Sequence, residues 1–162
     1  MRKAVGISKP ARMTGAYRNY RPITPDDVTT REAQLALALE PAIRWQLWLF
    51  FEPGAFGGQS LAMPCDDLPR RTPTDASEVL ARMFTTVSQY TGCTELIVAL
   101  ERRGGPDPNA LDRAWMAALA DACHRAGVRL RSVLISHTSG VREHEPPQPS
   151  LDGPAERGSV VP

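Results

Sequence analysis

The sequence predicts an α/β domain built on a mixed β-sheet with helices packed against it. Two segments with helical periodicity alternate with short apolar segments that have the composition of buried strands, an order typical of α/β folds. The first two strand segments are joined by a glycine-rich turn, so we expect an antiparallel hairpin and a sheet that is not purely parallel. The chain has 162 residues, of which 42% are hydrophobic, enough for one core. The expected order is β-β-α-β-α-β, with a final short β-strand.

A charged arm and a helix are expected before the first strand. Residues 1–23 combine many charges with scattered glycines and prolines, so we predict a flexible, disordered arm there. A helix is expected from Thr24 to about Leu39. Thr24 fits the N-terminal cap, Pro25 fits the first helical position, and Pro41 follows the end.

The next segments predict a β-hairpin followed by a loop. Residues 43–52 are dense in aromatic and branched side chains, which is typical of a buried strand. A Pro-Gly and a Gly-Gly pair mark the turn, and residues 60–63 are expected to return as the partner strand. Residues 64–73 hold three prolines and two adjacent aspartates, which favour a loop.

Two helices carry the strongest signals. The first is expected over residues 75–90, where Asp75 and Glu78 have the spacing of a capping box. The second is expected to begin after Asn109 as its cap and to end before Gly127, a residue that favours a left-handed C-terminus. Each has one apolar stripe. The stripes are Ala76, Val79, Leu80, Met83, Phe84 and Val87 in the first helix, and Leu111, Trp115, Ala118, Leu119, Ala122 and Ala126 in the second.

The remaining strands complete the sheet. Buried strands are expected over residues 95–100 and 128–136, and a short edge strand is expected to start at residues 141–142. Residues 146–162 are rich in Pro, Gly, Ser and charge, so we predict a disordered, Pro-rich tail. One α/β domain is therefore expected over residues 24–145.

The charges are divided unevenly along the chain. The net charge is +1, yet residues 1–21 hold six bases and no acid, while the other 141 residues hold 13 bases and 18 acids. Cations neutralise phosphates and tyrosines stack on exposed bases, so the arm is a candidate nucleic-acid-binding segment, the alternative being an ordinary disordered N-terminus. Its candidate residues are Arg2, Lys3, Lys9, Arg12, Tyr17, Arg18, Tyr20 and Arg21.

Cysteine use and hydropathy favour a cytoplasmic protein. The three cysteines are not clustered and form no CxxC motif. Such isolated thiols are expected to be reduced and buried. No run of about 18 apolar residues is present, so no membrane-spanning helix and no membrane partner are expected. The N-terminus has no apolar segment typical of a secretory signal.

One stretch carries a family resemblance. The strand segment Ile97–Leu100 is followed by Glu-Arg-Arg-Gly-Gly-Pro-Asp-Pro, then by Asp112 in the next helix. Across residues 97–130, and in element order, the chain resembles the JAB/MPN metalloprotease-like domain in its RadC form. In that family the strand ends in His-x-His-Pro-Ser-Gly-Asp-Pro, and an Asp opens the next helix. The resemblance implies a JAB/MPN-like fold and places Glu101, Arg103 and Asp112 at metal-site positions.

The chain departs from this family at the metal ligands. The family binds zinc through the two histidines and the aspartate, whereas the matching strand end here reads Glu101-Arg102-Arg103. A guanidinium is not a zinc ligand, and its charge repels a cation. We therefore expect no metal and no cofactor. Asp112 is then explained by the stabilisation of a helix N-terminus, or by an ion pair with Arg103.

These observations favour a non-catalytic module that binds a macromolecule. The favoured partner is nucleic acid or a nucleoprotein complex, bound through the basic arm. One alternative is a protein-only adaptor or scaffold that binds a partner through an edge strand or a helix surface. A further alternative is a small hydrolase with a rearranged site, although the sequence contains no G-x-S-x-G nucleophile elbow.

Overall fold

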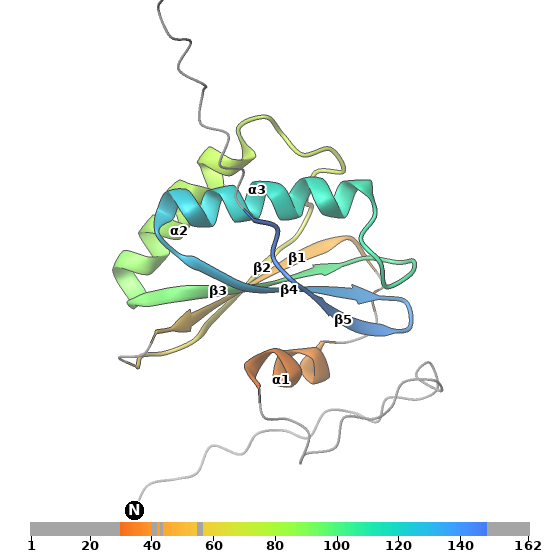
Figure 1. The fold of residues 1–162 in the computed structure, drawn as a ribbon, viewed down its shortest axis with the longest axis horizontal. Helices are drawn as coiled ribbons and strands as arrows, with labels where there is room; N and C mark the ends of the chain where they lie inside the picture. The colour runs from red at the N-terminus through yellow and green to blue at the C-terminus, as the bar shows by residue number, and fades with distance from the viewer. Residues whose placement is uncertain (1–29, 40–41, 43, 55–56, 149–162) are drawn as a thin grey trace, which may run out of the picture.

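The fold is a five-stranded sheet covered by helices on both faces (Figure 1). It was obtained as a computed structural model, which describes residues 30–39, 42, 44–54 and 57–148. The predicted arm and residues 149–162 of the predicted tail lie outside these ranges. The elements are α1 (Arg31–Ala38), β1 (Gln46–Pro53), β2 (Leu61–Cys65), α2 (Ala76–Thr91), β3 (Cys93–Glu101), α3 (Ala110–Ala126), β4 (Arg129–His137) and β5 (Gly140–His144).

The predicted mixed α/β sheet is confirmed. Its strand order is β2-β1-β3-β4-β5, with β3 and β4 parallel and the other neighbouring pairs antiparallel. A parallel pair needs a long crossover connection, and α3 supplies it between β3 and β4. The C-terminal ends of the parallel strands β3 and β4 therefore lie side by side at the same end of the sheet, where Glu101 is opposite Ser136.

Alternation along the strands divides the apolar side chains between two cores. In β1, Leu47, Leu49 and Phe51 belong to the larger core, which includes residues of α2 and α3. Phe50 faces the other way and packs with Leu35 of α1 in the smaller core. Helices α2 and α3 thus cover one face of the sheet, and the short α1 covers part of the opposite face (Figure 1).

Helix α1 begins later than the sequence predicted. Thr30 is its cap: its backbone is extended (φ −113°, ψ 153°) and its side chain accepts a hydrogen bond from the Ala33 N–H. The predicted cap, Thr24, lies outside the described residues, and the helix that ends before Leu39 starts at Arg31. Threonine fits a cap at either place, so composition alone did not locate the start.

At an irregularity in the β3–β4 pairing, ion pairs of Arg131 connect α1 to the sheet. The β3–β4 register shifts between Leu96 and Ile97. At this shift Arg131 pairs with Glu32 of α1 at 2.9 Å and with Glu95 of β3 at 3.2 Å. Because α1 has only eight residues, this contact and its apolar face together hold it against the sheet.

Helix α2 has the predicted length, but two details of its prediction were wrong. Gly92 closes it in the left-handed conformation (φ 71°), as expected. Asp75 is the N-terminal cap, but its side chain forms no cap hydrogen bond, so the predicted capping box does not form. Val79 is 46% exposed rather than part of the buried stripe. The buried face is centred on Phe84 and includes Ala81, which leaves Val79 at its margin.

Helix α3 has the cap that the sequence predicted, and it forms a full capping box. The Asn109 side chain accepts a hydrogen bond from the Asp112 N–H at 2.9 Å, and Asp112 accepts one from the Asn109 N–H at 2.8 Å. Gly127 ends the helix with φ 68°. These local contacts fix where the first turn of α3 begins, next to the end of β3.

This cap gives a first testable prediction. Asn109→Ala should lower the free energy of unfolding by about 1 kcal/mol in urea denaturation, because the Asp112 N–H loses its acceptor. Asp75→Ala is the matched control at the other helix, and we expect a change below about 0.5 kcal/mol there. Equal losses at the two caps would contradict this account.

Prolines lie in or just after the two edge strands of the sheet. The edge strand β2 carries Pro64, which pairs with Trp48 in the β1–β2 register. At the other edge, β5 covers only the second half of β4, from Val133 to His137. After β5 the chain continues through Pro146 and Pro147. The predicted edge strand is therefore confirmed and begins one residue earlier than expected.

Candidate functional site

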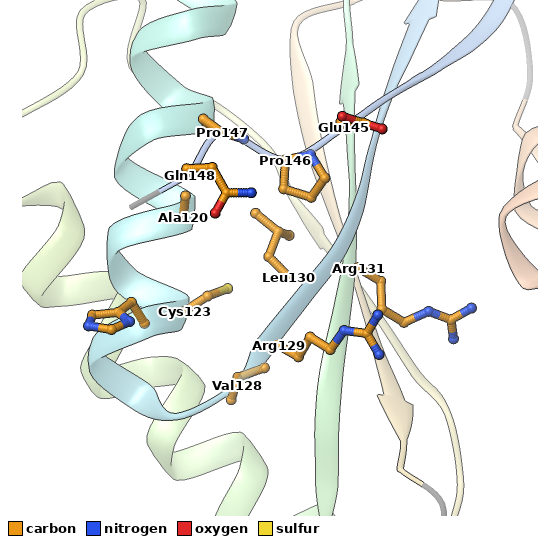
Figure 2. A pocket seen from close by; sticks show the side chains of 11 residues that line it. Ala120, Cys123, Val128, Arg129, Leu130, Arg131, Glu145, Pro146, Pro147 and Gln148 are labelled. Atoms are coloured by element: carbon orange, nitrogen blue, oxygen red, sulfur yellow. The ribbon is translucent and has the colours of Figure 1, made fainter. Parts of the chain in front are cut away.

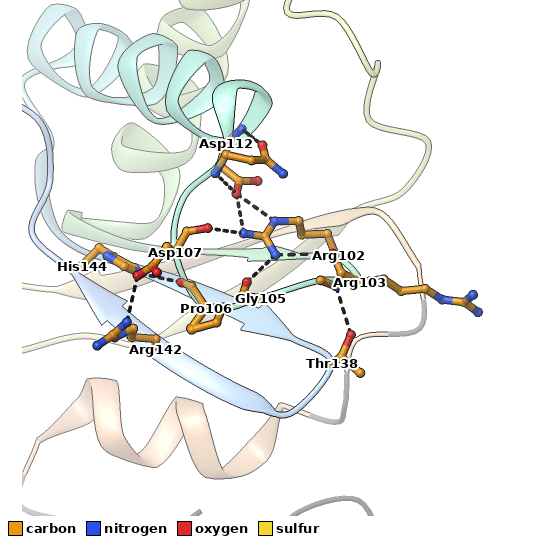
Figure 3. Close-up of polar contacts among 11 residues, drawn as sticks. Arg102, Arg103, Gly105, Pro106, Asp107, Asp112, Thr138, Arg142 and His144 are labelled. Carbon is orange, nitrogen blue, oxygen red and sulfur yellow. Dashed lines mark hydrogen bonds and ion pairs between the residues drawn. The ribbon is translucent and has the colours of Figure 1, made fainter.

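The end of β3 and the start of α3 meet at the place where the family resemblance locates its metal site. Glu101 is the last residue of β3, and Asp112 lies in the first turn of α3. Asp112 is fully buried. An ion pair with Asp112 does form there, but its partner is Arg102 and not the predicted Arg103 (Figure 3).

Arg102 is a buried arginine whose N–H groups all have acceptors. Its Nε and Nη2 donate to the same Asp112 oxygen, Oδ2, at 2.8 and 2.7 Å. Its Nη2 also donates to the Asp107 carbonyl at 2.8 Å, and Nη1 donates to the Gly105 carbonyl at 2.7 Å and the Arg103 carbonyl at 3.4 Å. The guanidinium has five N–H groups, so no donor is left for an external ligand.

Strand alternation explains why Arg102 occupies this position. Leu100 and Arg102 are two residues apart and share the face of the sheet that carries α3. Glu101 points to the opposite face, where it accepts a hydrogen bond from Trp48 Nε1 at 3.2 Å. Arg103 is exposed and its side chain extends away from Asp112 (Figure 3). This alternation was the signal that could have identified Arg102 from the sequence.

The Asp112 carboxylate is only partly satisfied. Its Oδ2 accepts hydrogen bonds from Arg102 and from the Asn109 N–H, whereas Oδ1 has no hydrogen-bond partner within the described structure. Among the described residues, Arg102 is the cation that pairs with this fully buried carboxylate. A buried carboxylate of this kind is costly unless it is paired, so the ion pair is a structural requirement of the site.

The loop between β3 and α3 is fastened to the β4–β5 hairpin. The Gly104 N–H donates to the Thr138 hydroxyl at 3.0 Å, and the Thr138 N–H donates to the Gly104 carbonyl at 3.3 Å. Asp107 pairs with Arg142 at 2.9 Å, and His144 Nε2 lies 3.1 Å from the Pro106 carbonyl (Figure 3). The β3–α3 loop is therefore held on two sides, by Arg102 on one and by the β4–β5 hairpin on the other.

A zinc ion does not fit the residues at this site. At the two positions where the resemblance would place histidines the chain has Glu101 and Arg103, and the guanidinium of Arg102 lies against the carboxylate of Asp112. The three histidines lie at the C-terminal end of α3, at the end of β4 and on β5. Within the described residues, no group of three His, Cys, Asp or Glu side chains is arranged to hold a metal ion.

His137 is a buried histidine held neutral next to this site. The Ser139 N–H donates to its Nδ1 at 3.2 Å, so Nδ1 acts as an acceptor. Burial lowers the pKa of His137, and the positive charges of Arg102 and Arg142 lower it further. The surroundings of His137 thus oppose its protonation.

This lowered pKa predicts a pH-dependent loss of stability. The folded protein binds the His137 proton less tightly than the unfolded chain does. The stability contributed by neutral His137 is therefore complete above the unfolded pKa of about 6.5, and is lost as the pH falls through the lower folded pKa. In urea denaturation between about pH 8 and 5, the wild type should lose more stability than His137→Gln. Parallel pH profiles would contradict the prediction.

A hollow of about 520 Å³ lies between the C-terminal half of α3, the start of β4 and Glu145–Gln148 (Figure 2). Cys123 lines it, but burial raises the pKa of this thiol to about 12, so it stays protonated and is a poor nucleophile. Arg129 and Arg131 at its border pair with Glu95 at 3.2 Å each. These residues favour no chemistry in this hollow.

Comparison with known proteins adds no family or structural relative. No protein-family model, no curated protein and no solved structure matches the chain. Across the part of the chain that the structure describes, no helix has the length and apolar character needed to cross a bilayer. The candidate arm residues, Arg2 to Arg21, lie outside the described residues, so their role stays a prediction.

Proposed function

We propose that this chain is a metal-free, JAB/MPN-like module that binds nucleic acid or a nucleoprotein and catalyses no reaction. The observation that carries the proposal is Arg102, which sets the chain's own cation beside Asp112, where the resembled family holds zinc. The element order and the position of Asp112 in the first turn of α3 support the resemblance. Arg102 has no free donor, which supports a structural role for this pair.

The separation of charge along the chain supports nucleic acid as the partner. The arm, residues 1–21, carries six cations and no acid, and the rest of the chain is net acidic. An acidic body is repelled by phosphates, so the arm would supply the attraction and its tyrosines would stack on exposed bases. Such binding depends strongly on salt and weakly on sequence.

The test uses the full chain with the six arm cations changed to glutamine. Affinity for labelled single-stranded RNA and DNA of about 20 nucleotides is measured by fluorescence anisotropy at salt concentrations of about 50–200 mM. We expect the neutralised arm to lose most of the affinity and most of the salt dependence. A double variant, Arg82→Gln with Arg125→Gln, changes two exposed, ion-paired arginines of α2 and α3 and should bind as the wild type does.

Three results would overturn the proposal. Unchanged affinity and salt dependence in the neutralised arm would remove the arm from the binding site. Stoichiometric zinc in elemental analysis of the purified protein would contradict the metal-free site. Absence of nucleic-acid binding by the wild type even at low salt would favour the protein-adaptor alternative instead.

A further inference from the structure

Helix α1 is held on the sheet by side-chain contacts. Among the described residues, no backbone hydrogen bond joins α1 to a strand, and those at its two ends stay within the helix and its caps. Its eight residues are fewer than the roughly 12–15 that an isolated helix needs in water. The helical form of α1 therefore depends on a small set of side-chain contacts with the sheet.

The apolar part of this attachment is small. The smaller core contains seven buried residues, against 18 in the larger core that α2 and α3 cover. Only two of the seven come from the α1 segment, namely Leu35 and the C-cap residue Leu39. Leu37, between them, is 48% exposed. Because the free energy of burial scales with apolar area, lifting α1 from the sheet costs much less than lifting α2 or α3.

Two ion pairs at the start of α1 complete the attachment. Arg31 Nε lies 2.8 Å from Glu52 Oε1 of β1. Glu32 Oε1 lies 2.9 Å from Arg131 Nη2 of β4, and Arg131 also pairs with Glu95 of β3 at 3.2 Å. Adjacent residues of α1 are thus fixed to different strands. Opening of α1 would break both pairs but leave Arg131 beside Glu95, so this guanidinium would keep a counter-charge.

The side chains under α1 form an apolar face that spans four strands. They come from β1, β3, β4 and β5, and they are Phe50, Ile97, Ala99, Leu134 and Val141. Alternation along each strand points these side chains away from α2 and α3, and none of them belongs to the larger core. The larger core can therefore stay intact when α1 leaves.

We infer that α1 is a displaceable cover, which leaves the sheet as one unit while the five strands, α2 and α3 stay folded. Local openings cost less free energy than global unfolding where they break few apolar contacts and no backbone ladder, and α1 meets both conditions. The chain then has a second folded state, in which the apolar face under α1 is exposed to solvent. This inference is independent of the proposed function.

A thiol placed under α1 measures the opening. Ala99→Cys in the full chain puts a small side chain at a fully buried position of the smaller core. Cys93, on the same strand and also fully buried, belongs to the larger core and serves as the internal reference. Alkylation by iodoacetamide is followed at both positions by mass spectrometry, at concentrations where the rate is proportional to reagent. Position 99 should react roughly tenfold faster than Cys93 or more, because Cys93 requires global unfolding.

Two leucines of α1 provide a matched pair of variants in this background. Leu35→Ala removes a buried contact with the sheet without weakening the helix-forming tendency of α1. It should raise the reaction rate at position 99 roughly tenfold or more. Leu37→Ala makes the same change at an exposed position of the same helix and should alter that rate less than about twofold.

Two arginines of β4 isolate the contribution of the ion pairs. Arg131→Gln removes the link to Glu32 of α1 and should raise the rate at position 99 roughly threefold. Arg129→Gln removes a pair with the same Glu95 that Arg131 contacts, but it breaks no ion pair with α1 in the described structure. It should leave the rate at position 99 unchanged.

Asn109→Ala separates local opening from global unfolding. Loss of the α3 cap should raise the rate at Cys93 about fivefold and leave the rate at position 99 unchanged, because α3 stays folded in the open state. Rates at position 99 and Cys93 that are equal and change together in every variant would mean that α1 leaves only when the whole domain unfolds, which would overturn the inference. Equal effects of Leu35→Ala and Leu37→Ala would overturn it as well, because α1 would then not be seated through Leu35.

Discussion

Replacing Arg102 by methionine should lower the free energy of unfolding by about 3–5 kcal/mol in urea denaturation. Methionine preserves much of the apolar stem but removes all five donors. It leaves Asp112 as a charged side chain with no exposed surface and no counter-charge. Breaking a buried pair on one side is far more costly than losing an exposed pair, which contributes about 0–1 kcal/mol.

Two further variants isolate the ion pair. Arg103→Met changes the neighbouring, exposed arginine and should alter stability by less than about 0.5 kcal/mol. Adding Asp112→Asn to Arg102→Met removes the buried negative charge, so the double variant should be more stable than Arg102→Met alone. If Arg102→Met and Arg103→Met have equal stability, Arg102 does not hold the site together.

Replacing Phe84 by alanine should also cost about 3–5 kcal/mol, because it creates a cavity in the larger core. Phe84 is fully buried between α2 and the sheet, and its ring meets that of Phe51 edge to face at a centroid distance of 5.8 Å. Phe84→Leu keeps most of the volume and should cost less, about 1.5 kcal/mol or below.

The control for Phe84 lies on the same helix. Tyr90 is 87% exposed near the end of α2, so Tyr90→Ala should change stability by less than about 0.5 kcal/mol. Thermal or urea denaturation of the three variants measures the difference. A loss at Tyr90 as large as that at Phe84 would mean that the face of α2 packed against the sheet is wrongly assigned.

Features that depend on contacts between residues close together in the chain were predictable from the sequence. Gly92 and Gly127 end their helices because only a residue without a side chain adopts the left-handed conformation cheaply. Asn109 caps α3 through a contact three residues away. The order of strands and helices follows from the same local patterns, and it is sufficient to predict a mixed sheet.

Features that depend on distant contacts were not predictable in the same way. Asp112 pairs with Arg102 because the end of β3 lies against α3. Adjacent residues of a strand point to opposite faces, so a shift of one residue would have brought Arg103 to Asp112 instead. The contact of Asp107 with Arg142 needs β5 to pair with β4, which brings together residues 35 positions apart. Which face α1 covers is likewise fixed by packing with Phe50 and Ile97, not by its own sequence.

The prolines at the two sheet edges have a consequence for self-association. An edge strand tolerates a proline only where the missing N–H would have pointed outwards, so β2 offers an incomplete row of donors at Pro64. Beyond β5, Pro146 and Pro147 supply no donors along the uncovered half of β4. A second copy of the chain therefore finds only a short ladder to extend, the five residues of β5 at one edge and a row interrupted at Pro64 at the other, which disfavours growth into a shared intermolecular sheet.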